Sequence, residues 1–201
     1  MQYLIRNPVS ALETGFLQWK SALVSNIACI FALLCGTANA ADPPAVPTIA
    51  AIPATGAMHS RDLVRMNRCD LENLYRGAQI GCPPRGVTRG RAIINPGSKL
   101  TVPTSKVVRV LWQGKVITDD GMMVNRVFGM RAIHARVYIG ESWLDGKPTV
   151  VMDYAGTSKL FPSIRDEVRE ISPGLYLGMA FKRTDAAPEL KAFFTLESRK
   201  N

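Results

Sequence analysis

Histidine is scarce in this sequence, which has only His59 and His134 among its 201 residues. A zinc site needs several ligands, and two histidines so far apart in the chain do not supply them. His134 alone could act as an axial ligand for haem, although a strand histidine bonded to a neighbour is the simpler interpretation. We therefore predict neither a metal site nor a cofactor.

The signature motifs of common enzymes are also missing. The chain contains no Gly-x-Ser-x-Gly, no phosphate-binding Gly-Lys-Ser/Thr loop and no Gly-x-Gly-x-x-Gly. These motifs build the nucleophile, phosphate and dinucleotide sites of hydrolases, kinases and dehydrogenases. Enzymes of those usual kinds are therefore excluded, and catalysis of another kind stays open.

Long apolar runs are lacking as well. The apolar run over residues 22–35 is too short for a membrane-spanning helix, which needs about 20 residues. Basic residues precede it, and the small residues Ala38 and Ala40 follow it at the positions that a signal peptidase recognises. We predict that residues 1–40 are a secretory signal peptide, cleaved before Ala41.

Two alternatives stay open for that segment: an uncleaved anchor, and a lipoprotein lipidated at Cys35, which the bulky Leu34 disfavours.

Residues 41–58 carry four prolines and a single charge, so they predict an extended Ala/Pro-rich linker. Residues 59–201 then form one domain, periplasmic or secreted.

Cysteine is sparse, with four in the chain and two, Cys69 and Cys82, beyond the predicted signal peptide. Two cysteines in an oxidising compartment usually pair. We predict a disulfide between them, with a reactive thiol as the alternative.

Acidic residues are absent from one long stretch. The chain has 25 Lys and Arg against 16 Asp and Glu, yet no acid lies between Glu72 and Asp119. The bases of this stretch form either a solvated face or a contact surface for anionic envelope lipids, whereas export argues against nucleic acid as a partner. The candidate residues of that surface are Arg85, Arg89, Arg91, Lys99, Lys106 and Arg109.

Apolar residues make up 47 % of the chain, which is enough to form the core of one globular domain. A helix is predicted from Ser60 to Gly77, followed by turn-rich coil to Pro103 with a short strand at residues 91–94. Further strands, alternating with period two, are predicted at residues 107–112, 115–118, 122–128, 131–139, 148–154, 175–181 and 190–196. The fold class is mainly β: an antiparallel meander forming a small lipocalin-like barrel or a curled sheet, with one N-terminal helix.

Several short motifs follow one another in a fixed order through this region: WQGK from Trp112, NR from Asn125, ESWLDG from Glu141, MDY from Met152, RDE from Arg165 and PGLYLG from Pro173. With them, the stretch from Leu71 to Leu196 resembles an uncharacterised bacterial and fungal family and is distantly similar to lipocalin-like β-barrels. The resemblance implies a barrel and an apolar ligand, and it implies no activity.

Polar and aromatic side chains in the predicted strands and in the segments between them are the candidate ligand-binding residues. An aspartate in the lumen beside an arginine could hold a ligand carboxylate or act as a general base, whereas on the solvent face the same charges would form an ion-pair ladder. The alternation does not say which face points inward. The candidates are Trp112, Asn125, His134, Tyr138, Trp143, Asp153, Tyr154, Arg165, Asp166 and Tyr176.

The sequence therefore predicts an exported β-barrel that binds an apolar or lipid-like ligand with an acidic head and docks on anionic envelope surfaces. Two alternatives are a small-molecule enzyme with a buried aspartate as its acid–base group, and an envelope module that binds a partner protein.

Overall fold

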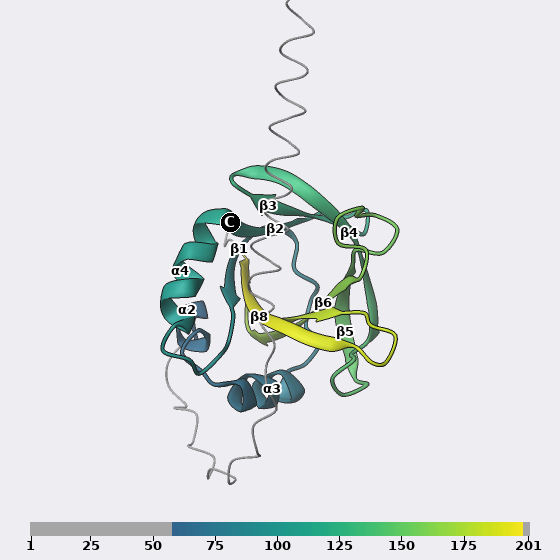
Figure 1. Ribbon diagram of the computed structural model, residues 1–201. Helices are drawn as coiled ribbons and strands as arrows, with labels where there is room; N and C mark the ends of the chain where they lie inside the picture. Colours follow the sequence, from purple (N-terminus) through teal and green to yellow (C-terminus); the bar gives the residue numbers. More distant parts are fainter. Residues whose placement is uncertain (1–57, 199–201) are drawn as a thin grey trace, which may run out of the picture. The chain divides into compact units, whose positions relative to one another are not determined.

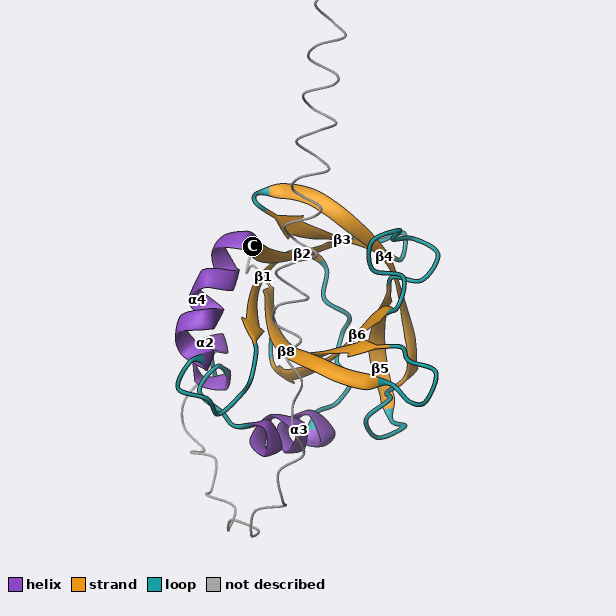
Figure 2. Ribbon diagram, in the orientation of Figure 1, coloured by secondary structure: helices purple, strands orange, loops and turns teal. Residues whose placement is uncertain are grey.

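The computed structural model describes residues 58–198, which form a closed barrel of eight antiparallel strands (Figures 1 and 2). The strands follow one another around the barrel in sequence order, and β1 closes the ring by pairing with β8. The expected mainly β meander is confirmed, in its closed form. The strands are β1 (Gly86–Ile93), β2 (Trp112–Ile117), β3 (Met122–Val127), β4 (Met130–Glu141), β5 (Pro148–Asp153), β6 (Ile164–Ser172), β7 (Leu175–Lys182) and β8 (Glu189–Ser198).

The single helix expected over residues 60–77 is two helices, α2 (Ser60–Leu63) and α3 (Arg68–Gly77). The break has a local cause in Asn67, which has extended backbone and whose side chain accepts a hydrogen bond from the Asp70 N–H. Asparagine is a favoured N-cap, so it starts a new helix at this point.

The strand expected over residues 107–112 is wrong, because the chain there is helical in α4 (Thr101–Leu111). β-Branched valines suggested a strand, yet Val107 and Val110 remain 64 % and 69 % exposed. Thr101 and Ser105, one helical turn apart, form the buried side of α4 instead. Burial of these small hydroxyl residues overrides the strand propensity of the valines.

The expected disulfide is also wrong: Cys69 and Cys82 are free and exposed. Cys69 lies in the first turn of α3, and the helix carries the chain about 12 Å along its axis before it ends at Gly77. Beyond the helix, the Cys82 carbonyl accepts a hydrogen bond from the Tyr176 hydroxyl, which holds this segment beside β7.

Two apolar clusters form the core. The inner cluster lies inside the barrel, and its buried members are Ile117, Met123, Ala135, Val150, Met152, Tyr154, Val168, Tyr176, Phe194 and Leu196. The outer cluster joins the barrel wall to α2 and α3, and its buried members are Leu63, Val64, Leu71, Tyr75, Ile93, Leu175, Leu177, Met179, Phe181 and Phe193. The interior of an eight-stranded barrel is just wide enough for its side chains or for one small ligand.

None of the helices within residues 58–198 is long and apolar enough to cross a membrane. The predicted signal peptide and nearly all of the predicted linker lie outside the described residues.

Candidate ligand site inside the barrel

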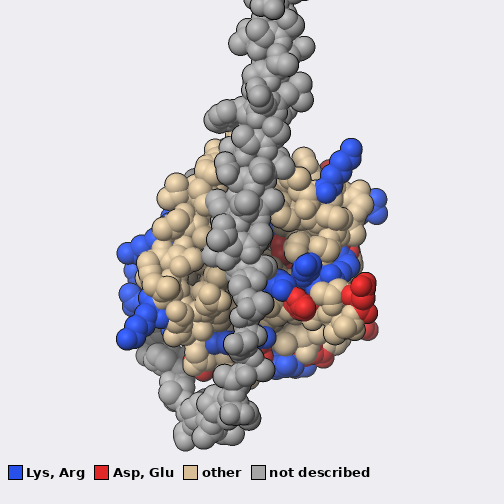
Figure 3. All heavy atoms as spheres, viewed as in Figure 1, with Lys and Arg blue, Asp and Glu red and all other residues tan. Residues whose placement is uncertain are grey.

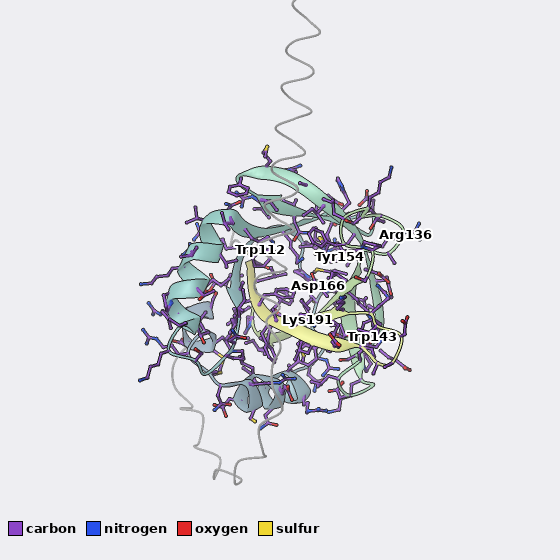
Figure 4. All side chains as sticks on the ribbon, viewed as in Figure 1. Trp112, Arg136, Trp143, Tyr154, Asp166 and Lys191 are labelled. Carbon is purple, nitrogen blue, oxygen red and sulfur yellow. The ribbon has the colours of Figure 1, made fainter. Side chains whose placement is uncertain are left out.

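Four polar side chains meet among the apolar residues of the barrel interior. Lys115 of β2 donates hydrogen bonds from Nζ to Asn125 Oδ1 at 3.0 Å, to the Tyr154 hydroxyl at 2.7 Å and to Asp166 Oδ2 at 2.8 Å. The Tyr154 hydroxyl also donates to Asp166 Oδ2 at 2.8 Å. Figure 4 shows Tyr154 and Asp166 within the ring of strands. We call Lys115, Asn125, Tyr154 and Asp166 the lumen cluster.

Asn125 is the hub of the lumen cluster. Its Oδ1 accepts from Lys115 and from the Trp112 indole N–H at 2.9 Å. Its Nδ2 donates to the Tyr154 hydroxyl at 3.0 Å and to the Ile133 carbonyl at 3.1 Å. Every hydrogen-bonding group of this amide is therefore used, which fixes its orientation.

A β-bulge brings Trp112 and Lys115 onto the same, inward face of β2. The pairing of β2 with β3 shifts register between Trp112 and Gly114, so one extra residue lies between them. Without the bulge, Trp112 and Lys115, three positions apart, would point to opposite faces, since strand side chains alternate. Gly114 allows the bulge because its φ is +119° and an added Cβ would lie 2.5 Å from the Thr88 carbonyl oxygen.

A second bulge, between β3 and β4, shapes the same site. The register shifts after Val124, and Ile133 at the shift has a φ of +65°, a conformation that β-branched residues rarely adopt. This strained backbone presents the Ile133 carbonyl to Asn125. Such strain persists only where the surrounding structure enforces it, and it clusters at functional sites.

The lumen cluster holds one cation and one carboxylate, both almost fully buried at side-chain exposures of 2 % for Lys115 and 6 % for Asp166. Burial lowers the pKa of Lys115, and the neighbouring Asp166 charge opposes that shift. Burial also raises the pKa of Tyr154, and the Asp166 charge adds to the rise. Because apolar side chains often replace a buried ion pair without loss of stability, stability alone does not explain this pair.

The lumen cluster lies toward the barrel end at which β2 and β6 begin and β5 finishes. At this end, apolar side chains that are only partly buried pack against the inner cluster, among them Trp112, Ile133 and Phe161. Phe161 comes from the loop between β5 and β6. The site thus has polar groups set within an apolar rim.

The structure therefore brings four of the candidate ligand-binding residues together: Trp112, Asn125, Tyr154 and Asp166. Tyr176 also points inward, yet it bonds to the Cys82 carbonyl and not to the lumen cluster.

The other candidates lie on the outside of the barrel. Asp153 pairs with Arg183 at 2.6 Å and accepts from the Tyr138 hydroxyl at 3.1 Å. Arg165 stacks on the Trp143 ring, 4.2 Å from its centroid. His134 is exposed, and its carbonyl accepts from the Thr157 hydroxyl. No group of His, Cys, Asp and Glu in residues 58–198 is arranged to hold a metal ion.

Sequence reasoning missed Lys115 as a site residue and counted it within the basic stretch. One signal could have found it: Lys115 shares a face with Ile117 in strict alternation, so a lysine on an apolar face was visible in the sequence. The bulge that also brings Trp112 onto that face was not visible in the sequence.

The chain matches no known family model, and no curated protein matches its sequence. Among solved structures, the crystal structure of a protein from Thermomonospora curvata is similar, with 16 % sequence identity and a TM-score of 0.44. The match covers 68 % of this chain and 90 % of that chain. The resemblance to an uncharacterised family and to lipocalin-like barrels stays a prediction, and the eight-stranded barrel is what the structure shows.

Proposed function

We propose that this protein is an exported β-barrel that binds a small, mostly apolar molecule and holds its neutral polar group at the lumen cluster. One observation carries the proposal: a buried Lys115–Asp166 ion pair, bonded to Tyr154 and Asn125, sits in an interior that is otherwise apolar. Pockets for small molecules combine apolar walls with a few convergent polar groups in the same way.

The charge balance of the lumen cluster selects the kind of polar group. Asp166 already neutralises Lys115, so a ligand carboxylate would gain little from the lysine and would meet the aspartate. A ligand hydroxyl can donate to Asp166, and a ligand hydroxyl or carbonyl can accept from Lys115 by replacing one of its three present partners. We therefore favour an alcohol or a ketone over the acidic head that the sequence suggested.

The apolar part of the ligand would lie against the rim formed by Trp112, Ile133 and Phe161. Met123 and Met152 line the interior behind the lumen cluster. Methionine side chains are flexible and polarisable, which suits an interior that repacks around different apolar shapes.

Tryptophan NMR tests this proposal on the full chain. The chain has three tryptophans, so ¹⁵N-tryptophan labelling gives three indole N–H signals, and Trp112→Phe identifies the one that reports on Asn125. We expect 1-octanol to shift the Trp112 signal saturably and octanoate to shift it far less. If neither probe moves it and no small molecule is released from the purified protein on denaturation, the proposal is wrong.

A double variant separates binding from stability. Lys115→Met/Asp166→Val removes the ion pair and should abolish the octanol response while the free energy of unfolding stays within about 1 kcal/mol or rises. The matched control, Arg183→Met/Asp153→Val, removes an ion pair on the outside and should keep the response. A purely structural lumen cluster would instead give lower stability with no octanol response in the original chain.

The enzyme alternative applies to the same groups, because the Tyr154 hydroxyl lies between Lys115 and Asp166 and offers a path for a proton. Mass spectrometry of the bound small molecule distinguishes the two functions. If the protein only binds, the molecule recovered after incubation with the protein has an unchanged mass, whereas an enzyme converts it into a product of different mass.

A further inference from the structure

A groove lies on the outside of the barrel, between α2, α4 and β1, with a cavity volume of about 230 Å³. Four basic side chains line it: Arg61, Arg65, Arg91 and Lys106. In Figure 3, blue Lys and Arg atoms gather at the left edge, over α4 and α2. The groove is remote in the fold from the lumen cluster, since Arg91 and the other odd-numbered residues of β1 lie on the outer face.

No ion pair within the described residues neutralises the charge of this groove. No ion pair or hydrogen bond joins the side chains of its four basic residues to any residue of 58–198. Arg61, Arg65 and Lys106 are exposed and Arg91 is half-buried. The buried cations Lys115, Arg165 and Arg169, by contrast, each pair with a carboxylate.

The carboxylate nearest in the sheet is already engaged. Glu197 accepts hydrogen bonds from the backbone N–H and the hydroxyl of Ser60. Burial lowers the pKa of Arg91, and the charges of Arg109 and Arg61 lower it further against the opposing effect of Glu197. The cations therefore repel one another across the groove.

Ser105 supplies a second, independent feature. It lines the groove at 1 % exposure, and its buried hydroxyl contacts no hydrogen-bond partner. The Thr101 hydroxyl, one turn earlier on α4, donates a hydrogen bond to the Asn95 carbonyl. A buried hydroxyl on this face of the helix can therefore have a partner, and that of Ser105 has none within residues 58–198. Buried polar groups are nearly always paired, and an unpaired one calls for an explanation.

Thr195 repeats this pattern beside the groove. It is the register partner of Arg91 across the β1–β8 pair, and its buried Oγ1 also lacks a partner. Two buried hydroxyls without a hydrogen-bond partner in residues 58–198 thus lie close to the four basic side chains, one lining the groove and one beside Arg91.

We propose that this groove binds a phosphate group. A phosphate offers several acceptor oxygens and a charge of nearly −2, which suits arginine forks, one lysine and one hydroxyl donor converging from α2, α4 and β1. A carboxylate has only two oxygens and one charge. The same chemistry occurs in a phospholipid headgroup and in a soluble phosphate, and the two sources are separated by the experiment.

The experiment uses the full chain and two probes. Calorimetric titration measures binding of inorganic phosphate, and flotation measures binding to phosphatidylcholine vesicles with or without phosphatidic acid. Saturable binding of either phosphate source supports the site, and binding to the acidic vesicles alone identifies the lipid source. Absence of both overturns the proposal.

Variants locate the site. Arg65→Gln/Arg91→Gln should weaken phosphate binding about tenfold or more. Arg85→Gln/Lys99→Gln makes the same change in net charge outside the groove and should leave binding within about twofold. Equal losses in both pairs would show nonspecific attraction and overturn the groove as a site.

Ser105→Ala separates a ligand-binding role from a structural one. It should weaken phosphate binding about threefold to tenfold while the urea midpoint without phosphate stays the same or rises, because the variant removes an unpaired buried hydroxyl. A fall in the urea midpoint with unchanged phosphate affinity would mean that the hydroxyl serves the fold, and it would contradict the proposed contact.

Discussion

At the residue scale, Arg169 shows how a single buried side chain can anchor an outer loop. Its Nη atoms bond to both carboxylate oxygens of Asp145 at 2.7 Å and to the carbonyls of Tyr75 and Lys147. Its Nε donates to the Pro148 carbonyl at 3.1 Å. All five N–H groups of the guanidinium thus have partners, which joins the β4–β5 loop and α3 to β6.

Arg169→Met should lower the free energy of unfolding by about 3–5 kcal/mol, because it leaves Asp145 buried without its partner. Urea denaturation measures the loss. The control is Arg68→Met, which removes an arginine that is 59 % exposed and paired with Glu72, and should cost no more than about 1 kcal/mol. Similar losses in the two variants would contradict the assigned role of Arg169.

The sequence identifies candidate residues where their chemistry alone selects them. It misplaces residues whose direction depends on an irregularity of the backbone. Asn125 and Tyr154 were candidates because they are polar or aromatic groups in predicted strands. Asp166 was a candidate for its charge alone, because no strand was predicted where β6 lies. Lys115 was counted by its charge with the bases of the acid-free stretch, although it alternates with Ile117 on an apolar face. The bulge at Gly114 that brings Trp112 onto the same face leaves no clear sign in a single sequence.

At the scale of elements, the turn of the β3–β4 hairpin contains a residue that is poorly suited to its backbone conformation. Phe128 and Gly129 form its two-residue turn with φ values of +50° and +77°. This type of turn favours Asn-Gly, since asparagine tolerates positive φ far better than an aromatic residue does. Phe128 also stays 40 % exposed, so its burial is incomplete and offsets only part of the strain.

Phe128→Asn should therefore raise stability by about 1 kcal/mol, seen as a higher melting temperature. Phe128→Ala removes the same exposed aromatic ring without the asparagine preference for positive φ, and it should not raise the melting temperature. If alanine stabilises as much as asparagine, exposure of the ring and not the turn backbone is the cause.

Elements differ in how far their local sequence determines them. The strands from Met122 to Asp153 were expected within a few residues, because their alternation and turn residues agree. Residues 107–111 have valines suited to a strand and still form a helix, since Ser105 and Thr101 are buried against the barrel. Helix α4 is thus set by tertiary packing, which the local pattern does not contain.

At the scale of the whole molecule, a barrel or a curled sheet followed from the number of short strands, whereas the closure of the barrel and its inside and outside did not. β7 is buried on both faces, with Leu177 in the outer cluster and Tyr176 in the inner one. Helices and loops cover the outer wall there, so hydrophobicity alone could not distinguish lumen from exterior.

Carboxylates on the outer wall tie the covering segments to the barrel. Asp145 joins the β4–β5 loop to Arg169, Asp153 joins β5 to Arg183, and Glu197 joins β8 to Ser60 at the start of α2. The hydrogen bond from Arg169 holds the pKa of Asp145 below its usual range. Burial opposes the shift at Asp153 and Glu197, yet hydrogen bonds hold the pKa of each below its usual range.

These lowered pKa values make the barrel acid-sensitive. A carboxylate whose pKa is lower in the folded state stabilises that state fully above its unfolded pKa, near 4, and loses this contribution as the pH falls through the folded value. Burial raises the pKa of Glu167, so that residue has the opposite effect, and its stabilising contribution is lost as the pH rises. The pKa values of Asp120 and Glu189 are lowered as well, by hydrogen bonds with Thr118 and Lys191. Five lowered carboxylates against one raised carboxylate predict a net fall in stability below about pH 4.

Urea denaturation at pH 7, 5 and 3 should show this fall, and Asp145→Asn should flatten it by removing one of the lowered groups. Glu167→Gln should steepen it, because the opposing group is lost. Asp119→Asn, at a carboxylate whose side chain is 82 % exposed, should leave the shape of the curve unchanged. If stability falls with pH in Asp145→Asn as steeply as in the original chain, acid acts on the barrel through groups other than the carboxylates of its outer wall.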